Sequence, residues 1–154
     1  MITFIGDFQC KLDGKGRLVF PAAFKKVLNG QGQDRLVLRK DLFESCLVIY
    51  PYSEWEQELN RIRSKLNLYN REHSHFLRDF FKGSAELSLD TNGRILIPKR
   101  LLDLVGISKD VVLMGIDNKI EIWDLGKYEK QEVDSDELAS MAEKILGNPG
   151  LINE

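Results

Sequence analysis

The fold of this chain is decided by one stretch, Leu12-Asp13-Gly14-Lys15-Gly16-Arg17-Leu18-Val19-Phe20-Pro21, which returns as Leu89-Asp90-Thr91-Asn92-Gly93-Arg94-Ile95-Leu96-Ile97-Pro98. Seven of these ten positions are identical or an aliphatic exchange. The correspondence continues downstream, where residues 22–28 align with 99–105 and residues 46–50 align with 119–123. Similarity at a fixed separation indicates a duplicated structural unit, here of about 75 residues.

Each copy predicts a β-hairpin followed by a helix. In the pattern Asp-x-x-Gly, Asp takes position i of a type I turn, and Gly takes position i+3 with the positive φ of a G1 bulge. The turn residues are therefore Asp13, Gly16, Asp90 and Gly93. Pro21 and Pro98 follow the second strand of each hairpin and suit the first turn of a helix, where a missing N–H costs little.

Hydrophobic periodicity predicts the remaining elements. Expected strands, besides one that ends before Asp13, are 17–20, 36–39, 47–50, 85–89, 94–97, 111–114 and 120–123. The helices after the two prolines should end near Gly30 and Gly106, with inward faces formed by Phe24, Val27 and Leu28 in one copy and Leu101, Leu104 and Val105 in the other. Between the copies, two helices are expected, carrying Trp55, Leu59, Ile62 and Leu66, then Phe76, Phe80 and Phe81 before Gly83. We interpret both apolar sets as core. For the first set, an interface between chains of an oligomer is the alternative.

These elements give an α+β fold in four parts. Residues 1–52 form the first half, 53–82 a helical connection, 83–124 the second half, and 125–154 a C-terminal helix and tail, with the helix near residues 136–146. Each half alone would leave short strands and one helix face exposed. We therefore expect the halves to interlock.

The charge distribution is uneven although the formal net charge is only −2. Residues 1–50 carry 8 Lys/Arg against 5 Asp/Glu, and residues 111–154 carry 4 against 10. An acidic C-terminal end leaves room for a basic face elsewhere. No run approaches the ~20 apolar residues of a membrane span. The start Met1-Ile2-Thr3-Phe4 lacks a secretory pattern, and two isolated cysteines suit a reducing cytosol, so we expect a cytoplasmic protein.

The Asp-x-x-x-Arg pairs, Asp13 with Arg17 and Asp90 with Arg94, are the candidate functional site. One interpretation is structural: each Asp caps its own turn while the Arg pairs with the carboxylate. The other is that the turns present cations to phosphate or a guanine edge, because a guanidinium held by a carboxylate is already oriented for bidentate binding. Lys15 and Asn92 occupy the matching third position. The two interpretations are compatible.

The sequence gives less support to a catalytic or metal site. Two pseudo-symmetric aspartates resemble the proton-sharing pair of aspartic hydrolases, but an Arg four residues after each Asp should keep it ionised. His73 and His75, at spacing i, i+2, do not face one ligand from a helix, so no metal site is expected. No phosphate loop or nucleophile motif is present. We expect a non-enzyme without a cofactor or a small-molecule substrate.

The two turns and their surroundings resemble the MraZ family, which is related to the AbrB/SpoVT and MazE DNA-binding proteins. Further similar positions are Cys46-Leu47, Tyr50-Pro51, Glu54-Trp55, Phe76, Arg78, Phe80-Phe81, Gly83, Gly115 and Glu121-Ile122-Trp123. The resemblance implies a duplicated swapped-hairpin, double-split β-barrel in a closed homo-oligomeric ring. It also implies a nucleoid-associated regulator of the division and cell-wall gene cluster that binds short promoter repeats, its own operon included. DNA-binding roles carry over to Arg17 and Arg94 and, at the less similar positions, to Lys15 and Asn92. The alternative is an antitoxin-type or scaffolding protein whose main partner is another protein.

Overall fold

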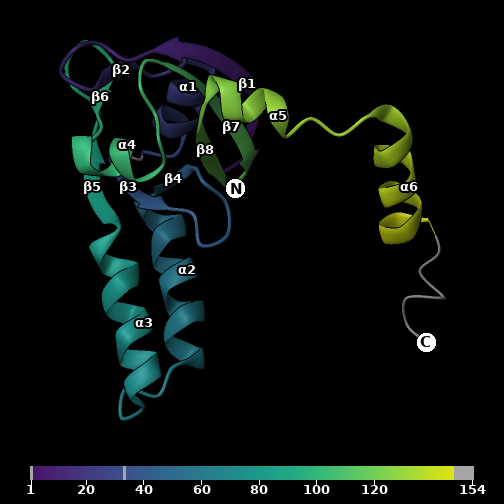
Figure 1. The fold of residues 1–154 in the computed structure, drawn as a ribbon. Helices are drawn as coiled ribbons and strands as arrows, with labels where there is room; N and C mark the ends of the chain where they lie inside the picture. The colour runs from purple at the N-terminus through teal and green to yellow at the C-terminus, as the bar shows by residue number, and fades with distance from the viewer. Residues whose placement is uncertain (1, 33, 148–154) are drawn as a thin grey trace.

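The computed structural model describes residues 2–32 and 34–147 of the chain, and its strands form two antiparallel sheets (Figure 1). The larger sheet has six strands in the order β1 (Phe4–Lys11), β7 (Asp110–Asp117), β8 (Lys119–Asp124), β4 (Leu47–Pro51), β3 (Arg35–Lys40) and β5 (Ser84–Ser88). The smaller pairs β2 (Arg17–Val19) with β6 (Arg94–Leu96).

The strand order shows that the two copies interlock. Strands β1 to β4 belong to the first copy and β5 to β8 to the second, yet β1 pairs with β7, β4 with β8, and β3 with β5. Exchanging each strand for its counterpart in the other copy reproduces the same order from the opposite edge. The predicted α+β class is confirmed. Its finer description, a double-split barrel, stays a prediction.

Six helices connect or flank the strands in the described residues. They are α1 (Ala22–Gly30), α2 (Tyr52–Lys65), α3 (Arg71–Lys82), α4 (Lys99–Leu104), α5 (Leu125–Lys130) and α6 (Ser135–Leu146). Helices α2 and α3 lie side by side and project from one end of the sheet, whereas α6 stands away from the body (Figure 1). None of these helices has the combination of length and apolar composition needed to cross a membrane.

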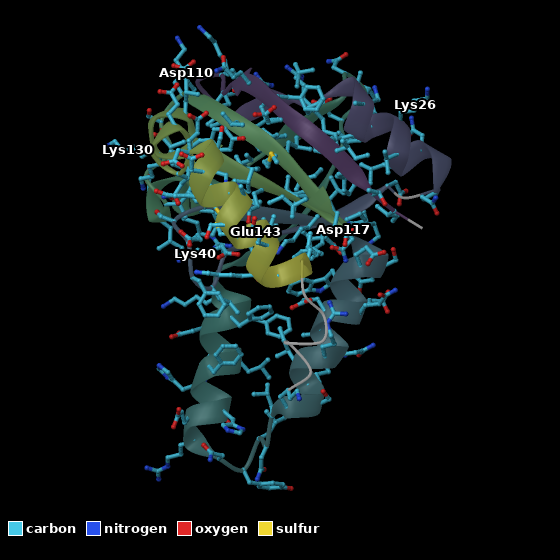
Figure 2. The ribbon with its side chains drawn as sticks, turned by 90° about the vertical axis from the view of Figure 1, so that its right-hand side faces the viewer. Lys26, Lys40, Asp110, Asp117, Lys130 and Glu143 are labelled. Atoms are coloured by element: carbon cyan, nitrogen blue, oxygen red, sulfur yellow. The ribbon has the colours of Figure 1, made fainter. Side chains whose placement is uncertain are left out.

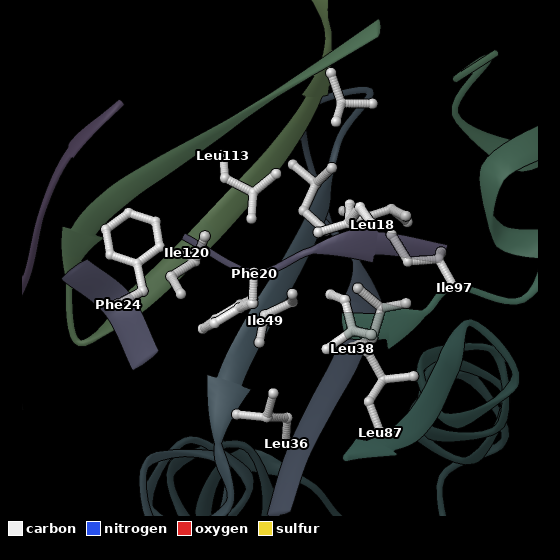
Figure 3. Close-up of a cluster of buried hydrophobic side chains, with 14 of the residues drawn as sticks. Leu18, Phe20, Phe24, Leu36, Leu38, Ile49, Leu87, Ile97, Leu113 and Ile120 are labelled. Carbon is white, nitrogen blue, oxygen red and sulfur yellow. The ribbon is translucent and has the colours of Figure 1, made fainter. Parts of the chain in front are cut away.

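The main core lies between the large sheet and the β2–β6 ladder, as Figure 3 shows. Leu18 of β2 and Ile95 of β6 face this core and are fully or almost fully buried. Phe24 of α1 packs edge-on against Phe4, Phe8 and Phe20. The hairpins that carry the candidate site are therefore anchored by residues of both copies.

A second, aromatic cluster fixes α2 and α3 to the sheet. Trp55 of α2 stacks on Phe80 of α3 at 5.5 Å between ring centroids, and Leu59 is buried beside them. Arg39 of β3, 4% exposed, lies in the same region and donates to the Tyr50 hydroxyl over 2.9 Å. The predicted core role of Trp55 and Leu59 is confirmed.

Three apolar side chains that the sequence pattern assigned to the core are exposed, and Ile62 and Leu66 are only half-buried. Leu104 is 54% exposed, and its place in the core is taken by Leu102, because the short helix α4 turns Leu101 and Leu102 inward. Phe76 and Phe81 are 38% and 45% exposed, since α3 projects past the sheet and only Phe80 contacts it closely. Helix α5 was not expected from the sequence.

Candidate nucleic-acid interface

The first turn is held by its aspartate. The Gly16 amide donates to the Asp13 carbonyl over 3.1 Å, and the Asp13 amide donates to the Arg17 carbonyl over 2.9 Å, which closes the turn. Asp13 Oδ1 accepts from the amides of Lys15 and Arg17, each at 2.9 Å. Gly16 has φ +83°, as the predicted G1 bulge requires.

The second turn repeats this geometry. Asp90 Oδ1 accepts from the amides of Asn92 and Arg94 at 2.8 and 2.9 Å, and the Gly93 amide donates to the Asp90 carbonyl over 3.0 Å. Gly93 has φ +72°. Asp13, Gly16, Asp90 and Gly93 thus occupy the turn positions that the sequence pattern predicts.

Each arginine is clamped through one nitrogen only. Arg17 Nε lies 2.7 Å from Asp13 Oδ2, and Arg94 Nε lies 3.0 Å from Asp90 Oδ2. Within residues 2–32 and 34–147, neither terminal Nη group accompanies Nε in a hydrogen bond to the protein. The carboxylate therefore fixes the guanidinium plane and leaves its outer edge available for a bidentate partner.

The β2–β6 ladder places both arginines on one face. Arg17 is paired with Leu96 and Arg94 with Val19, so these four side chains share the side opposite the buried Leu18 and Ile95. A two-residue offset across neighbouring strands puts the two arginine Cα atoms about 8 Å apart. Val19 and Leu96 are 63% and 54% exposed between them. The site is therefore a small face with two cations around an apolar centre.

The two turns differ in what covers their glycines. A Cβ on Gly93 would meet Lys25 Nζ at 2.9 Å, whereas a Cβ on Gly16 would meet the Ile97 carbonyl oxygen at 2.8 Å and Leu102 Cδ1 at 3.6 Å. Lys25 and Leu102 occupy equivalent positions in the aligned copies. The first turn has its extra cation at the tip, on Lys15, and the second receives one from α1, on Lys25.

Hydrogen bonding keeps both turn aspartates ionised. The Arg17 amide, with smaller contributions from the Lys15 amide and the Arg17 side chain, lowers the pKa of Asp13 from 3.8 to about 2. The pKa of Asp90 is lowered by the same set of contacts, the Arg94 amide first. A proton-sharing aspartic pair needs one raised pKa, so these two carboxyls do not match the hydrolase alternative.

Acid should weaken the first turn. A folded-state pKa below the unfolded value stabilises the folded chain above pH 3.8, and this contribution is lost as the pH falls toward about 2. Asp13→Asn should have a lower free energy of unfolding than the parent protein at neutral pH. This difference should shrink as the pH falls from 3.8 toward about 2. Urea unfolding at several pH values measures it, with the exposed Asp136→Asn as the matched control. A deficit that stays constant from neutral pH to pH 2 would contradict the prediction.

One further cluster was not predicted from the sequence, because it joins the β3–β4 loop to a residue of β8. Ligand atoms of Asp41, Cys46 and Glu121 lie within 4.8 Å of one another, an arrangement that could hold a metal ion. Burial raises the pKa of the Cys46 thiol to about 12, which opposes the thiolate that a metal needs. Asp41 Oδ2 already accepts from the amides of Phe43 and Glu44, and Glu121 accepts from the Trp123 indole. These contacts give the cluster a local structural role.

The two histidines make separate contacts. His73 Nδ1 accepts from the Asn67 amide over 2.8 Å, and His75 Nε2 lies 3.4 Å from Asp79 Oδ2. Each therefore supports the α2–α3 connection or α3 itself.

The structure brings all the predicted site residues to the two ends of one ladder and adds two that the sequence did not single out, Val19 and Leu96. Val19 and Leu96 were seen only as members of apolar strands, although strict alternation with Leu18 and Ile95 would have placed them outward. Lys25 is one of several lysines and arginines near the turns in the sequence, and only the close approach of the two copies shows that it lies beside Gly93.

Fold and turns together define a duplicated, interlocked α+β protein whose candidate site is a pair of arginine-bearing β-turns. The sequence model of the MraZ protein, described as antitoxin-like, matches residues 3–79 and again residues 80–146. The chain belongs to the MraZ family. It is 42% identical over 148 residues to the transcriptional regulator MraZ of Bacteroides thetaiotaomicron, covering 96% of this chain and 95% of that protein. It is 43% identical over 149 residues to the protein of that name from Christiangramia forsetii, covering 96% of each. The protein of that name from Clostridium acetobutylicum is 35% identical over 142 residues, 92% of this chain and 96% of its own length.

Proposed function

We propose that this chain is a DNA-binding transcriptional regulator and not an enzyme. One observation carries the proposal: Arg17 and Arg94 lie on a single exposed face, each held by its own aspartate with its outer edge open. Such a guanidinium suits a phosphate or the N7/O6 edge of guanine. The relatives named as transcriptional regulators support this assignment.

The contact residues in this proposal are Arg17 and Arg94, with Lys15 and Asn92 at the turn tips. The exposed Val19 and Leu96 between the arginines offer apolar contact to thymine methyl groups. A two-stranded β-ribbon is narrow enough to enter a major groove. One such face spans few base pairs, so a single contact should bind weakly.

Several copies of the β2–β6 face in one assembly would bind DNA more tightly than a single copy. We propose that the chain assembles into a homo-oligomeric ring of swapped-hairpin double-split barrels, associated with the nucleoid. Regular copies of the turns would then favour DNA with regularly spaced short repeats. The targets in this proposal are promoter repeats of the division and cell-wall gene cluster, including those of the protein's own operon.

The test is a footprint of the DNA upstream of the protein's own gene, followed by altered spacing of the protected repeats. We expect an insertion of half a helical turn, about five base pairs, to lower affinity at least tenfold while every repeat stays intact. A full-turn insertion is the matched control and should cost less. Equal affinity for all three DNAs would contradict phased reading.

A protein-directed role is the second candidate, and the antitoxin-like description of the family model favours it. In that case the exposed faces would serve a protein partner, and affinity for DNA would not depend on repeat number. Binding to one and to three repeats separates the two candidates.

A further inference from the structure

Helix α6 lies apart from the rest of the chain although it has an apolar side. Leu138 and Ile145 are 60% and 65% exposed, with Met141 on the same side, and no residue of α6 is buried. A helix of twelve residues without packing is only marginally stable in water. An amphipathic helix of this kind needs a surface to cover its apolar side.

The polar side of α6 is acidic. Its first turn contains Asp136 and Glu137, and Glu143 lies near its end (Figure 2), against the single cation Lys144. Asp134 caps the helix by accepting from the Glu137 amide over 2.8 Å. Among the described residues, none of these carboxylates forms an ion pair. The complementary surface should therefore be apolar with a basic rim.

One groove of about 640 Å³ has this character. It lies between α3, α4 and the segment after β3, and its apolar wall includes Leu42, Phe76 and Leu104, all of them exposed. These include two of the side chains whose exposure the sequence pattern had not predicted. The groove is thus lined by apolar side chains that no other part of the described chain covers.

The rim of this groove is basic. Lys40, Lys82 and Arg100 line it, and none of them pairs with a carboxylate among the described residues. Arg100 donates to the Lys82 and Ser84 carbonyls, which fixes its position without neutralising its charge.

Two carboxylates, Asp41 and Asp79, also line the groove. Asp79 lies beside His75, and Asp41 accepts from the Phe43 and Glu44 amides. These contacts fix the two carboxylates in place without neutralising them, so the three cations against two carboxylates give the groove a formal net charge of +1.

The helix does not reach this groove in its own chain. Helix α6 stands on the side of the sheet opposite α3 and α4 in Figure 1 and lies in the foreground of Figure 2. Four residues, 131–134, join it to α5, and four extended residues span at most about 14 Å. The occupant that fits is the same helix of another copy.

We propose that α6 of one chain docks in the α3–α4 groove of a second copy. Leu138, Met141 and Ile145 cover Leu42, Phe76 and Leu104, while the acidic side meets Lys40, Lys82 and Arg100. Because a helix on one chain meets a groove on the next, the contact is heterologous and propagates around a ring. The proposal specifies the oligomeric contact of the proposed function and does not depend on DNA binding.

Cross-linking between differently marked chains tests the occupant. One full-length chain carries Leu104→Cys and another Ile145→Cys, both with Cys10→Ser to remove the half-buried native thiol. Treating the mixture with a short bis-maleimide should give a covalent dimer of unlike chains. The pair Tyr69→Cys and Ile145→Cys is the control, since Tyr69 is fully exposed at the α2–α3 turn, outside the groove.

A chain carrying both Leu104→Cys and Ile145→Cys distinguishes docking of α6 within its own chain from docking on a second copy. A cross-link within one chain and none between chains would overturn the proposal. An oligomer that gives no more cross-link at Leu104 than at Tyr69 would also overturn it.

Charge exchange supplies the second measurement. Lys82→Glu alone and Glu143→Lys alone should each lower the mass found by light scattering at micromolar concentration, and the double variant should restore it. Circular dichroism checks that each variant is folded, which is expected because both side chains are exposed. A monomeric parent protein, or single variants with unchanged mass, would refute the contact. DNA binding is measured separately, so failure here leaves the proposed function open to its own test.

Discussion

Replacing Arg17 and Arg94 together with alanine is expected to weaken DNA binding at least tenfold and to flatten its dependence on salt. Base or phosphate contacts of this kind contribute about 1–3 kcal/mol each, and 1.4 kcal/mol is a tenfold change in Kd. Each phosphate that no longer binds an arginine should reduce the slope of log K against log salt by about 0.9. Titration of labelled operator DNA at several salt concentrations measures both effects.

The control must remove the same charge elsewhere. Arg63→Ala with Arg71→Ala takes two exposed arginines from α2 and α3 and leaves both turns intact. Both double variants lose the same charge, so the control should keep nearly all of the affinity if the turns, and not the net charge, bind the DNA. Binding that falls by the same factor in both would show that net charge, and not the turns, determines affinity.

A single substitution should also reveal that the two turns are unequal. Lys15 and Lys25 add cations to different turns from different places, one at a turn tip and one from α1. The two faces of a chain therefore need not read the same bases. Comparing Arg17→Ala with Arg94→Ala on one repeat would measure this difference directly.

The turns could be predicted from the sequence because their chemistry is local. An aspartate, a glycine three residues later and an arginine after it contain nearly all the contacts that the structure shows at each site. The same holds for the end of α3, because Gly83 directly follows the helix. Duplication added the expectation that the two turns belong to one arrangement.

The features that could not be predicted from the sequence depend on contacts between the two copies of the repeat. Periodicity alone does not say that β2 pairs with β6, and therefore that Arg17 and Arg94 share a face. The exposure of Leu104 likewise depends on Leu102 taking the inner position beside Gly16. Such contacts join residues more than seventy positions apart, and no local pattern encodes them.

Gly16 and Gly93 show most clearly what the repeat could not predict, because these equivalent positions contact different residues. Both have positive φ, so a side chain at either should cost about 1–2 kcal/mol. At Gly16 an added Cβ would also lie 2.8 Å from the Ile97 carbonyl oxygen, which is backbone, and Ile97 in turn donates its amide to the Gly16 carbonyl. At Gly93 the nearest atom is the flexible end of Lys25.

We therefore expect Gly16→Ala to lower the free energy of unfolding by about 3 kcal/mol, and Gly93→Ala by less than about 2 kcal/mol. The difference arises because Lys25 can move aside at little cost, whereas Ile97 can move only if the β2–β6 ladder opens. Urea unfolding of both variants measures it, and Gly14→Ala is the control, since a Cβ there meets nothing within 4 Å and φ is not positive. Equal losses at Gly16 and Gly93 would mean that the ladder is looser than the structure shows. It could then not hold the two arginines at a fixed separation, and the case for paired recognition of DNA by a single face would fail with it.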